Sequence, residues 1–192
     1  MRIKSENGFS YLDVMIALII LMVGVMAAAG ALTANLVRAY ETEKQALAKQ
    51  LALSAIESIF AARDLGRRSN AGLSNWRAVG NVGNNPDENG TPQGIFLNGW
   101  TPIRQDLGAD GIAGTADDAC PAPGPCIVGS YTNNSPILQD YERKIVITDL
   151  QDSERPSPLY EIRMRRIDVT VRYRVNQLQR EQTVSTIITR YD

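Results

Sequence analysis

An acidic, glycine-rich stretch from residue 106 to residue 118 has the residue types that could bind a metal ion. Its carboxylates are Asp106, Asp110, Asp117 and Asp118. Calcium takes six to eight oxygen ligands from carboxylates, carbonyls and water, so this stretch is a candidate calcium site. The match to an EF-hand loop is partial, because Gly108 stands at the third position and Asp117 replaces the usual Glu at the twelfth. A solvated cluster of turns is the alternative interpretation, since acids and glycines are common in ordinary turns.

The two cysteines of the chain could form a disulfide. Cys120 and Cys126 enclose a short segment rich in proline and glycine, which can fold back on itself. Compartments outside the cytoplasm favour such bonds. The spacing is not Cys-x-x-Cys, which argues against a redox-active pair. We therefore predict a structural disulfide that fixes this loop locally and adds little to global stability.

The remaining composition argues against an enzyme. The 192 residues include no histidine, so the commonest general base and the commonest metal ligand are missing. Two cysteines cannot complete a standard zinc site, and the sequence has neither a Gly-x-Ser-x-Gly motif nor a phosphate-binding loop. The net charge of −1 gives no indication of a nucleic-acid partner. We expect five arginines of the C-terminal third to lie on a solvated, charge-balanced face: Arg163, Arg165, Arg166, Arg172 and Arg174.

An apolar run near the N-terminus predicts a membrane-spanning helix. Residues 14–37 contain no Asp, Glu, Lys or Arg, and about 20 apolar residues suffice to span a bilayer. Arg2 and Lys4 precede the run, so the N-terminus is expected in the cytoplasm and the residues after Val37 on the periplasmic or outer side. The run is too long for an ordinary secretory signal. A plain N-terminal anchor remains an alternative.

One carboxylate, Asp13, enters this apolar region. Its insertion costs on the order of 2.5–3.5 kcal/mol at a helix centre and less near the interface, so such a residue normally has a partner. A free amino group on the same or a neighbouring chain is one candidate. If the chain is cut after Gly8, Phe9 supplies that amine.

The residues Gly8-Phe9-Ser10-Tyr11-Leu12-Asp13 and the apolar helix that follows resemble the type IV prepilin signature. The resemblance implies cleavage after Gly8 by a prepilin peptidase and N-methylation of Phe9. It also implies a single-pass inner-membrane protein with a periplasmic head. Other pilin subunits, membrane lipid and the inner-membrane pilus assembly machinery would be its partners. The acidic residue of the family is usually Glu, so Asp13 is a departure that shortens the reach of the carboxylate by one methylene.

The elements expected to position these residues define an α+β, pilin-like fold. We expect a leader over residues 1–8, a membrane and polymerisation half-helix over 9–37 and an amphipathic half-helix over 38–66. The buried stripe of the second half is predicted at Leu47, Leu51, Ala55 and Ile59. Residues 67–136 are predicted to be irregular, and residues 137–192 to form a small antiparallel sheet. The apolar phase of residues 160–175 changes at Arg165-Arg166, which predicts a bulge or a strand break there.

The expected function is structural. The second half of the helix, particularly residues 48–58, resembles minor pilins of the PilV kind, which implies a minor subunit of a type IV pilus that assembles by helix bundling. A type II secretion pseudopilin is the first alternative. A membrane-anchored periplasmic binding module that does not polymerise is the second, and cleavage after Gly8 distinguishes it from both pilin interpretations.

Overall fold

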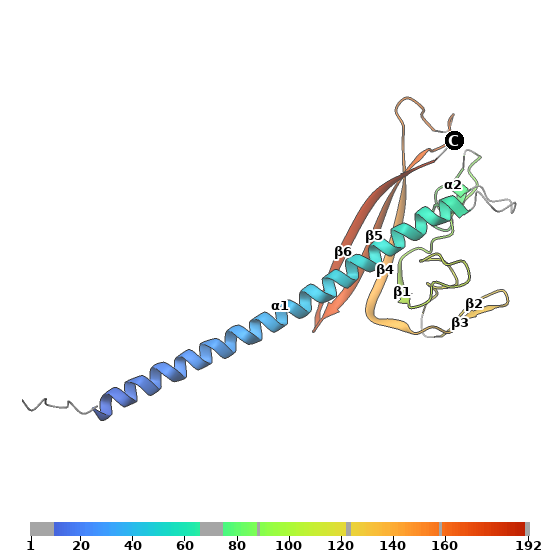
Figure 1. The fold of residues 1–192 in the computed structure, drawn as a ribbon. Coiled ribbons are helices and arrows are strands. Elements are labelled where there is room, and N and C mark those ends of the chain that lie inside the picture. The colour runs from blue at the N-terminus through green and yellow to red at the C-terminus, as the bar shows by residue number, and fades with distance from the viewer. Residues whose placement is uncertain (1–9, 66–74, 88, 122–123, 158, 191–192) are drawn as a thin grey trace, which may run out of the picture. The chain divides into compact units, whose positions relative to one another are not determined.

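The structure, a computed structural model, describes residues 10–65, 75–87, 89–121, 124–157 and 159–190. These residues form an α+β arrangement in which a long helix precedes the strands (Figure 1). The elements are α1 (Tyr11–Leu65), α2 (Asn75–Ala78), β1 (Trp100–Arg104), β2 (Cys126–Val128), β3 (Tyr131–Asn133), β4 (Ile137–Leu150), β5 (Met164–Val175) and β6 (Leu178–Thr189). The chain divides into two compact units, residues 1–43 and residues 44–192, and α1 contributes to both.

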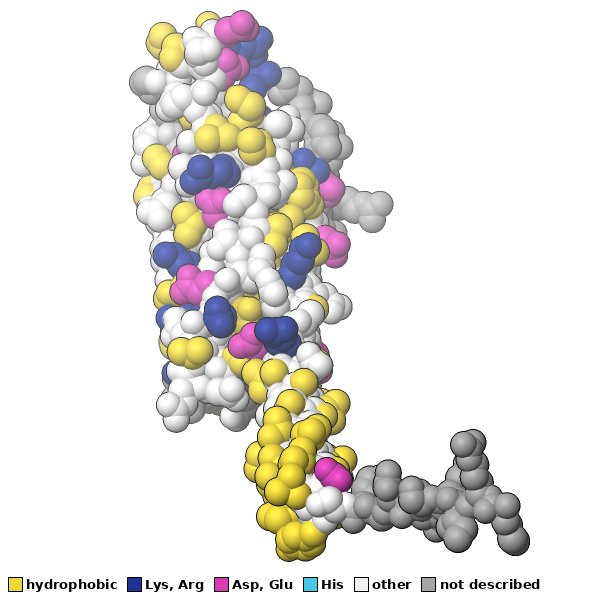
Figure 2. All heavy atoms as spheres, turned by 90° about the vertical axis from the view of Figure 1, so that its left-hand side faces the viewer, with side chains coloured by type: hydrophobic (Ala, Val, Ile, Leu, Met, Phe, Trp, Pro, Cys, Tyr) yellow, Lys and Arg dark blue, Asp and Glu magenta, His cyan; other side chains and the backbone are white. Residues whose placement is uncertain are grey.

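The first unit is the N-terminal part of α1, and it has no buried side chain among its described residues. Every residue from Ser10 to Tyr40 is exposed. Hydrophobic side chains cover the visible surface of this part of the helix (Figure 2). Leu, Ile, Met and Ala favour helix, and no Pro interrupts the segment, which explains why one regular helix forms. The two half-helices predicted from the sequence form one continuous helix over Tyr11–Leu65.

In the second unit, four antiparallel strands form a sheet in the order β1-β4-β5-β6, and β2 pairs with β3 in a separate hairpin. The C-terminal half of α1 packs on one face of this sheet. The shared core is made of apolar side chains from the helix and from the inward positions of the strands, chiefly Ala52, Ile56, Ile59, Ile145, Ile147, Ile167, Val169 and Val171. The small antiparallel sheet expected near the C-terminus is therefore present, and β1 extends it with a strand from earlier in the chain.

The buried stripe of α1 differs from the one predicted. Ala48 and Ala52 are fully buried, whereas Leu47 is 38% exposed and Leu51 only partly buried. Ala55 and Ile59 are buried as predicted. Alanine has almost no side chain to separate a helix from its neighbour, so the helix turns its small residues toward the sheet and leaves the leucines at the flanks of the contact.

The predicted bulge or strand break at Arg165-Arg166 is wrong. Strand β5 begins at Met164 and pairs without interruption with β4 on one side and β6 on the other. Arg165 occupies an inward position in phase with Ile167 and is 2% exposed, so it does not belong to the solvated arginine face. The charge is accommodated because the Nε of Arg165 lies 2.7 Å from Oδ1 of Asp149 and its Nη1 donates to the carbonyl of Trp76 at 2.8 Å. The other four arginines are exposed or half-buried.

The segment predicted to be irregular contains α2, β1, β2 and β3, joined by turns, and residues 66–74 lie outside the described part. Two amide side chains attach it to the sheet. Asn81 donates from Nδ2 to the carbonyl of Ile145 at 2.9 Å and accepts from the amide of Ile147 at 2.8 Å. Asn85 donates to the carbonyl of Ile147 at 3.2 Å. These bonds satisfy backbone amide and carbonyl groups at the edge of β4 beyond Lys144, where the pairing of β4 with β1 ends.

Candidate functional site

The exposed apolar part of α1 is the first candidate site. By length and composition this helix could cross a membrane, and none of its most apolar window is buried within the chain. A core helix of a soluble protein would be mostly buried, so that explanation does not fit, whereas a signal sequence passes the same test. The segment is thus compatible with a membrane anchor, as the sequence predicted.

Asp13 lies in the first turn of α1. Its side chain is exposed, and its backbone amide donates to the carbonyl of Ser10 at 2.9 Å, which starts the helix. A negative charge in a first helical turn interacts favourably with the helix dipole, by about 0.3–1 kcal/mol at an exposed position. Gly8 and Phe9, the predicted processing residues, lie outside the described residues, so the structure does not place the proposed amine beside Asp13.

Thr33 and Asn35 are the polar side chains within the apolar segment, and the hydroxyl of Thr33 is satisfied inside the helix. Thr33 donates its hydroxyl to the carbonyl of Ala29 at 3.0 Å, which removes the need for water at this position. Gly24 and Gly30 have open space around them, since a Cβ built at either would meet nothing within 4 Å. Small residues of this kind allow helices to approach closely in an apolar environment. The surface is therefore suited to lipid and to other helices.

The acidic loop is the second candidate site, and its carboxylates bind the loop's own backbone. Asp118 is fully buried, and its Oδ1 accepts the amides of Gly114 and Thr115, both at 2.8 Å. Its Oδ2 lies 3.0 Å from Nη2 of Arg143, an inward residue of β4 that is 2% exposed. Burial raises the pKa of Asp118 to about 6, although the guanidinium and the two amides act in the opposite direction. The pair attaches the acidic loop to the sheet.

Asp117 and Asp110 meet at a threonine. Oδ2 of Asp117 accepts the amides of Ala109 and Asp110, and the hydroxyl oxygen of Thr115 lies 2.6 Å from Oδ1 of Asp117 and 2.9 Å from Oδ2 of Asp110. Burial raises the pKa of Asp110 above its usual value. Gly108 is required here, because its φ is +86° and an added Cβ would lie 2.3 Å from the Asp117 carboxylate.

The four predicted calcium ligands are thus not arranged as one cluster. Asp106 accepts the amide of Gly108, Asp118 faces Arg143, and only Asp110 and Asp117 approach each other. In the described part of the chain, no group of three or more His, Cys, Asp or Glu side chains is placed to hold a metal ion. The hydrogen bonds support the turn-cluster interpretation, and calcium binding stays a prediction. Asp110 and Asp117 also line a cleft of about 530 Å³ together with Tyr131 and Val128.

Cys120 and Cys126 are joined by a disulfide, which confirms the predicted bond. Cys126 is the first residue of β2, and β2 pairs with β3. Arg104, at the end of β1, is 5% exposed and donates from Nη1 to the carbonyl of Ser135 at 2.8 Å and from Nη2 to the carbonyl of Gly124. The disulfide loop is therefore tied to the sheet through this arginine.

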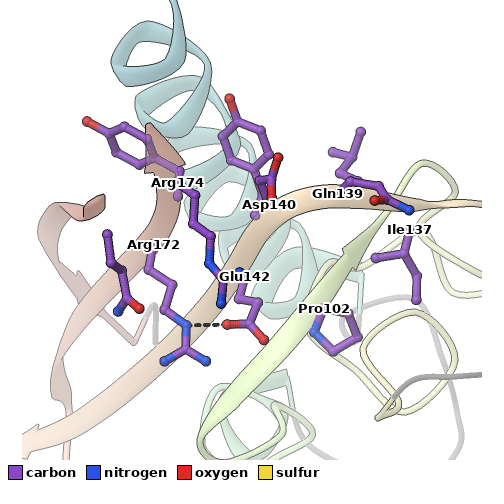
Figure 3. Close-up of a pocket in the computed structure, with 11 residues that line it drawn as sticks. Pro102, Ile137, Gln139, Asp140, Glu142, Arg172 and Arg174 are labelled. Carbon is purple, nitrogen blue, oxygen red and sulfur yellow. Dashed lines mark hydrogen bonds and ion pairs between the residues drawn. The ribbon is translucent and has the colours of Figure 1, made fainter. Parts of the chain in front are cut away.

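A groove of about 400 Å³ lies at one end of the sheet, and the sequence analysis did not anticipate it (Figure 3). The register between β1 and β4 shifts between Pro102 and Arg104, and Asp140 of β4 adopts a φ of +67°. The strand bends there and opens the groove. Arg172 and Glu142 form an ion pair on its wall, and the guanidinium of Arg172 also lies 4.3 Å from the ring centre of Trp100.

Sequence reasoning also missed the four arginines that are buried among the described residues: Arg63, Arg104, Arg143 and Arg165. A signal existed for two of them. Arg143 precedes Ile145 and Ile147 at a spacing of two, and Arg165 precedes Ile167 and Val169 in the same way. Alternation along a strand places all residues of one phase on one face, so the pattern itself indicated that these cations point inward.

No protein-family model, no curated protein sequence and no solved structure matches the chain.

Proposed function

We propose that the chain is a structural subunit of a type IV pilus, a minor pilin that is cleaved after Gly8, methylated on the Phe9 nitrogen and assembled by helix bundling. Before assembly it would be a single-pass inner-membrane protein with residues 44–192 in the periplasm. Its partners would be the prepilin peptidase, the membrane assembly machinery and other pilin subunits. The proposal assigns no catalytic step to the chain.

One observation carries the proposal. A single helix, α1, has an exposed apolar N-terminal half with one carboxylate in its first turn, and its C-terminal half is built into the core of a four-stranded antiparallel sheet. An apolar surface of this length is unstable in water and must be covered by lipid or by other apolar helices. A subunit that moves from membrane to filament exchanges the first cover for the second, and the helix is suited to both.

Asp13 supplies the proposed means of assembly. A cleaved chain begins with a positively charged amine, and an unpaired charge buried in a helix bundle costs several kcal/mol. Asp13 would neutralise the Phe9 amine of its own chain or of an adjacent subunit. Because the carboxylate can pair at only one position along the neighbouring helix, the same contact would set the axial register between subunits.

The groove beside Asp140 is the observation that favours a second candidate, the membrane-anchored binding module. Its volume lies within the range of ordinary ligand pockets, and it is lined by charged and aromatic side chains. A binding module uses this groove while it stays in the membrane with its N-terminus uncut. A type II secretion pseudopilin shares processing and helix bundling with the first candidate, and would be found with a secretion apparatus instead of a pilus.

The test compares three forms of full-length tagged protein in a host that assembles the filament: the parent, Asp13→Ala and Asp13→Glu. Asp13→Ala should insert in the membrane and be cleaved, but should be several-fold depleted in sheared filaments, because the amine loses its counter-charge. Asp13→Glu, which restores the usual family residue, should incorporate as well as the parent or better. Glu43→Ala removes an exposed α1 carboxylate outside the apolar run and serves as the matched control. Equal incorporation of Asp13→Ala and parent would overturn the charge-pairing mechanism.

A further inference from the structure

A buried cation with neutral partners, Arg104 of β1, contacts the disulfide loop. The guanidinium of Arg104 donates to two backbone carbonyls and lies with Nη2 3.8 Å from Sγ of Cys120. Its Nε is buried and has no hydrogen-bond partner. Among the residues that the structure describes, no carboxylate comes within ion-pair distance of this arginine. A buried cation without a counter-ion is unusual, and the nearest group that could become negative is the Cys120 sulfur.

The two cysteines differ in their access to solvent. Cys126 is 1% exposed and belongs to β2, whereas Cys120 is half-buried and follows the acidic loop. An external reagent can therefore reach Cys120 and not Cys126. Access and positive charge coincide at the same sulfur, and both favour reaction of a thiolate.

We propose that Cys120 is the exchange sulfur of this pair, the residue that forms the mixed disulfide with an external disulfide when the newly exported chain is oxidised. Arg104 acts as a positioning residue that stabilises the Cys120 thiolate through its charge. The external disulfide is that of a dithiol-disulfide oxidoreductase or of a small molecule such as oxidised glutathione. The inference does not depend on filament assembly, since it concerns how the loop is closed in an oxidising compartment.

The reaction has two exchange steps. The Cys120 thiolate attacks one sulfur of the external disulfide, a Cys120–sulfur bond forms, and the first external thiolate leaves. The Cys126 thiolate then attacks Sγ of Cys120, the Cys120–Cys126 bond forms, and the second external thiolate leaves. Two electrons pass from the cysteines to the external disulfide, and the two protons of the cysteine thiols end on the two released external thiols. Arg104 favours the first step because it lowers the free energy of the attacking thiolate.

The test uses the full-length chain in detergent micelles, reduced and freed of reductant, with oxidised glutathione as the probe. Cys126→Ser leaves Cys120 alone, and Cys120→Ser leaves Cys126 alone. Adduct formation followed by mass should be about tenfold faster for Cys120 at pH 7, since Cys126 is buried. In the Cys126→Ser background, Arg104→Gln should slow adduct formation at Cys120 about fivefold and raise the pH at which its rate is half-maximal. The loss of the positive charge reduces the fraction of thiolate, and this effect exceeds the gain in nucleophilicity of each thiolate. Arg104→Lys, which restores the charge, should recover most of the rate.

The matched control is each variant unfolded in urea, where the two cysteines should react alike and Arg104→Gln should have no effect. Equal or faster reaction of Cys126 in the folded chain would overturn the proposal. If Arg104→Gln fails to fold, the Cys126→Ser chain still decides the role of the charge. The pH at which its rate of adduct formation is half-maximal should be lower in the folded chain than in urea. Identical values in the two states would contradict the proposed role of Arg104.

Discussion

The two units of this chain use apolar and charged residues in opposite ways. Residues 10–40 expose a long series of Leu, Ile, Val and Met side chains and bury none of them. The described part of residues 44–190 holds the buried apolar core and also buries charged side chains, including Arg143 and Asp118. The contrast indicates two different surroundings. The first unit is suited to a medium that has no water, and the second is a folded domain in which Arg143 and Asp118 form a buried ion pair.

The largest expected difference comes from placing a carboxylate in each unit at an alanine of the same helix. Ala55 is fully buried, so Ala55→Asp puts an unpartnered acid into the core, which costs several kcal/mol and should unfold the domain or lower its Tm steeply. Ala28 is exposed, so Ala28→Asp should leave that Tm unchanged and instead reduce membrane insertion, by about 2.5–3.5 kcal/mol. Tryptophan fluorescence reports the melting, because Trp76 and Trp100 both lie in residues 44–192. A lower Tm for Ala28→Asp would contradict the comparison.

Two isoleucine-to-alanine substitutions, one in each unit, test the same contrast between the units. Ile59 is fully buried against the sheet, and Ile59→Ala should lower the free energy of unfolding by about 2–5 kcal/mol, because it removes apolar contacts and leaves a cavity. Ile19 is 60% exposed in the first unit, and Ile19→Ala should leave unfolding of the domain unaffected. Chemical denaturation in detergent micelles measures both. Equal effects would mean that Ile19 takes part in the folded core.

Acidification should increase the contribution of the buried Asp118 carboxyl to the stability of the second unit. The pKa of Asp118 is about 6 in the folded chain and 3.8 by reference, so between these values the folded state holds a proton that the unfolded state has lost. The contribution of Asp118 to stability should therefore rise as the pH falls from 7 to 4, by up to about 3 kcal/mol at about 1.4 kcal/mol for each pKa unit.

The control for this effect is Asp118→Asn, which cannot titrate. The unfolding free energy of the parent minus that of Asp118→Asn should increase as the pH falls, while the contributions of the other carboxyls cancel. If this quantity decreases instead, Arg143 lowers the pKa of Asp118 more than burial raises it.

The smallest effect is expected at the flank of the helix. Leu47 was predicted to be buried but is 38% exposed, so Leu47→Ala should cost less than about 1 kcal/mol, well below the cost at Ile59. The same denaturation measurement applies. A cost equal to that of Ile59→Ala would restore the stripe that the sequence suggested.

Features with one strong local cause could be predicted from the sequence. The charge-free apolar run and the apolar stripe that follows it predicted α1, a small antiparallel sheet was predicted in the C-terminal third, and two nearby cysteines predicted the disulfide. The side of α1 that faces the sheet was predicted only in part, because leucine and alanine compete there and close packing favours the smaller residue.

Features that depend on contacts between distant segments could not be predicted. Asn81 hydrogen-bonds the edge of a strand more than sixty residues away, and Arg165 pairs with Asp149, its partner on the neighbouring strand β4. The groove depends on a left-handed residue, Asp140, in a strand whose sequence gives no turn signal. In the acidic loop, the composition identified the carboxylates, but only the fold assigns each of them its backbone partner.

The central claim is that the chain is a processed filament subunit, and the mass of its mature N-terminus tests it most directly. The full chain is expressed in membranes with and without a prepilin peptidase, and intact mass and N-terminal peptides are measured. With the peptidase, the mature protein should begin at Phe9 with one added methyl group, and Gly8→Ala should block or strongly reduce this cleavage. A chain that keeps residues 1–8 in the presence of an active peptidase would contradict the account and favour the membrane-anchored module.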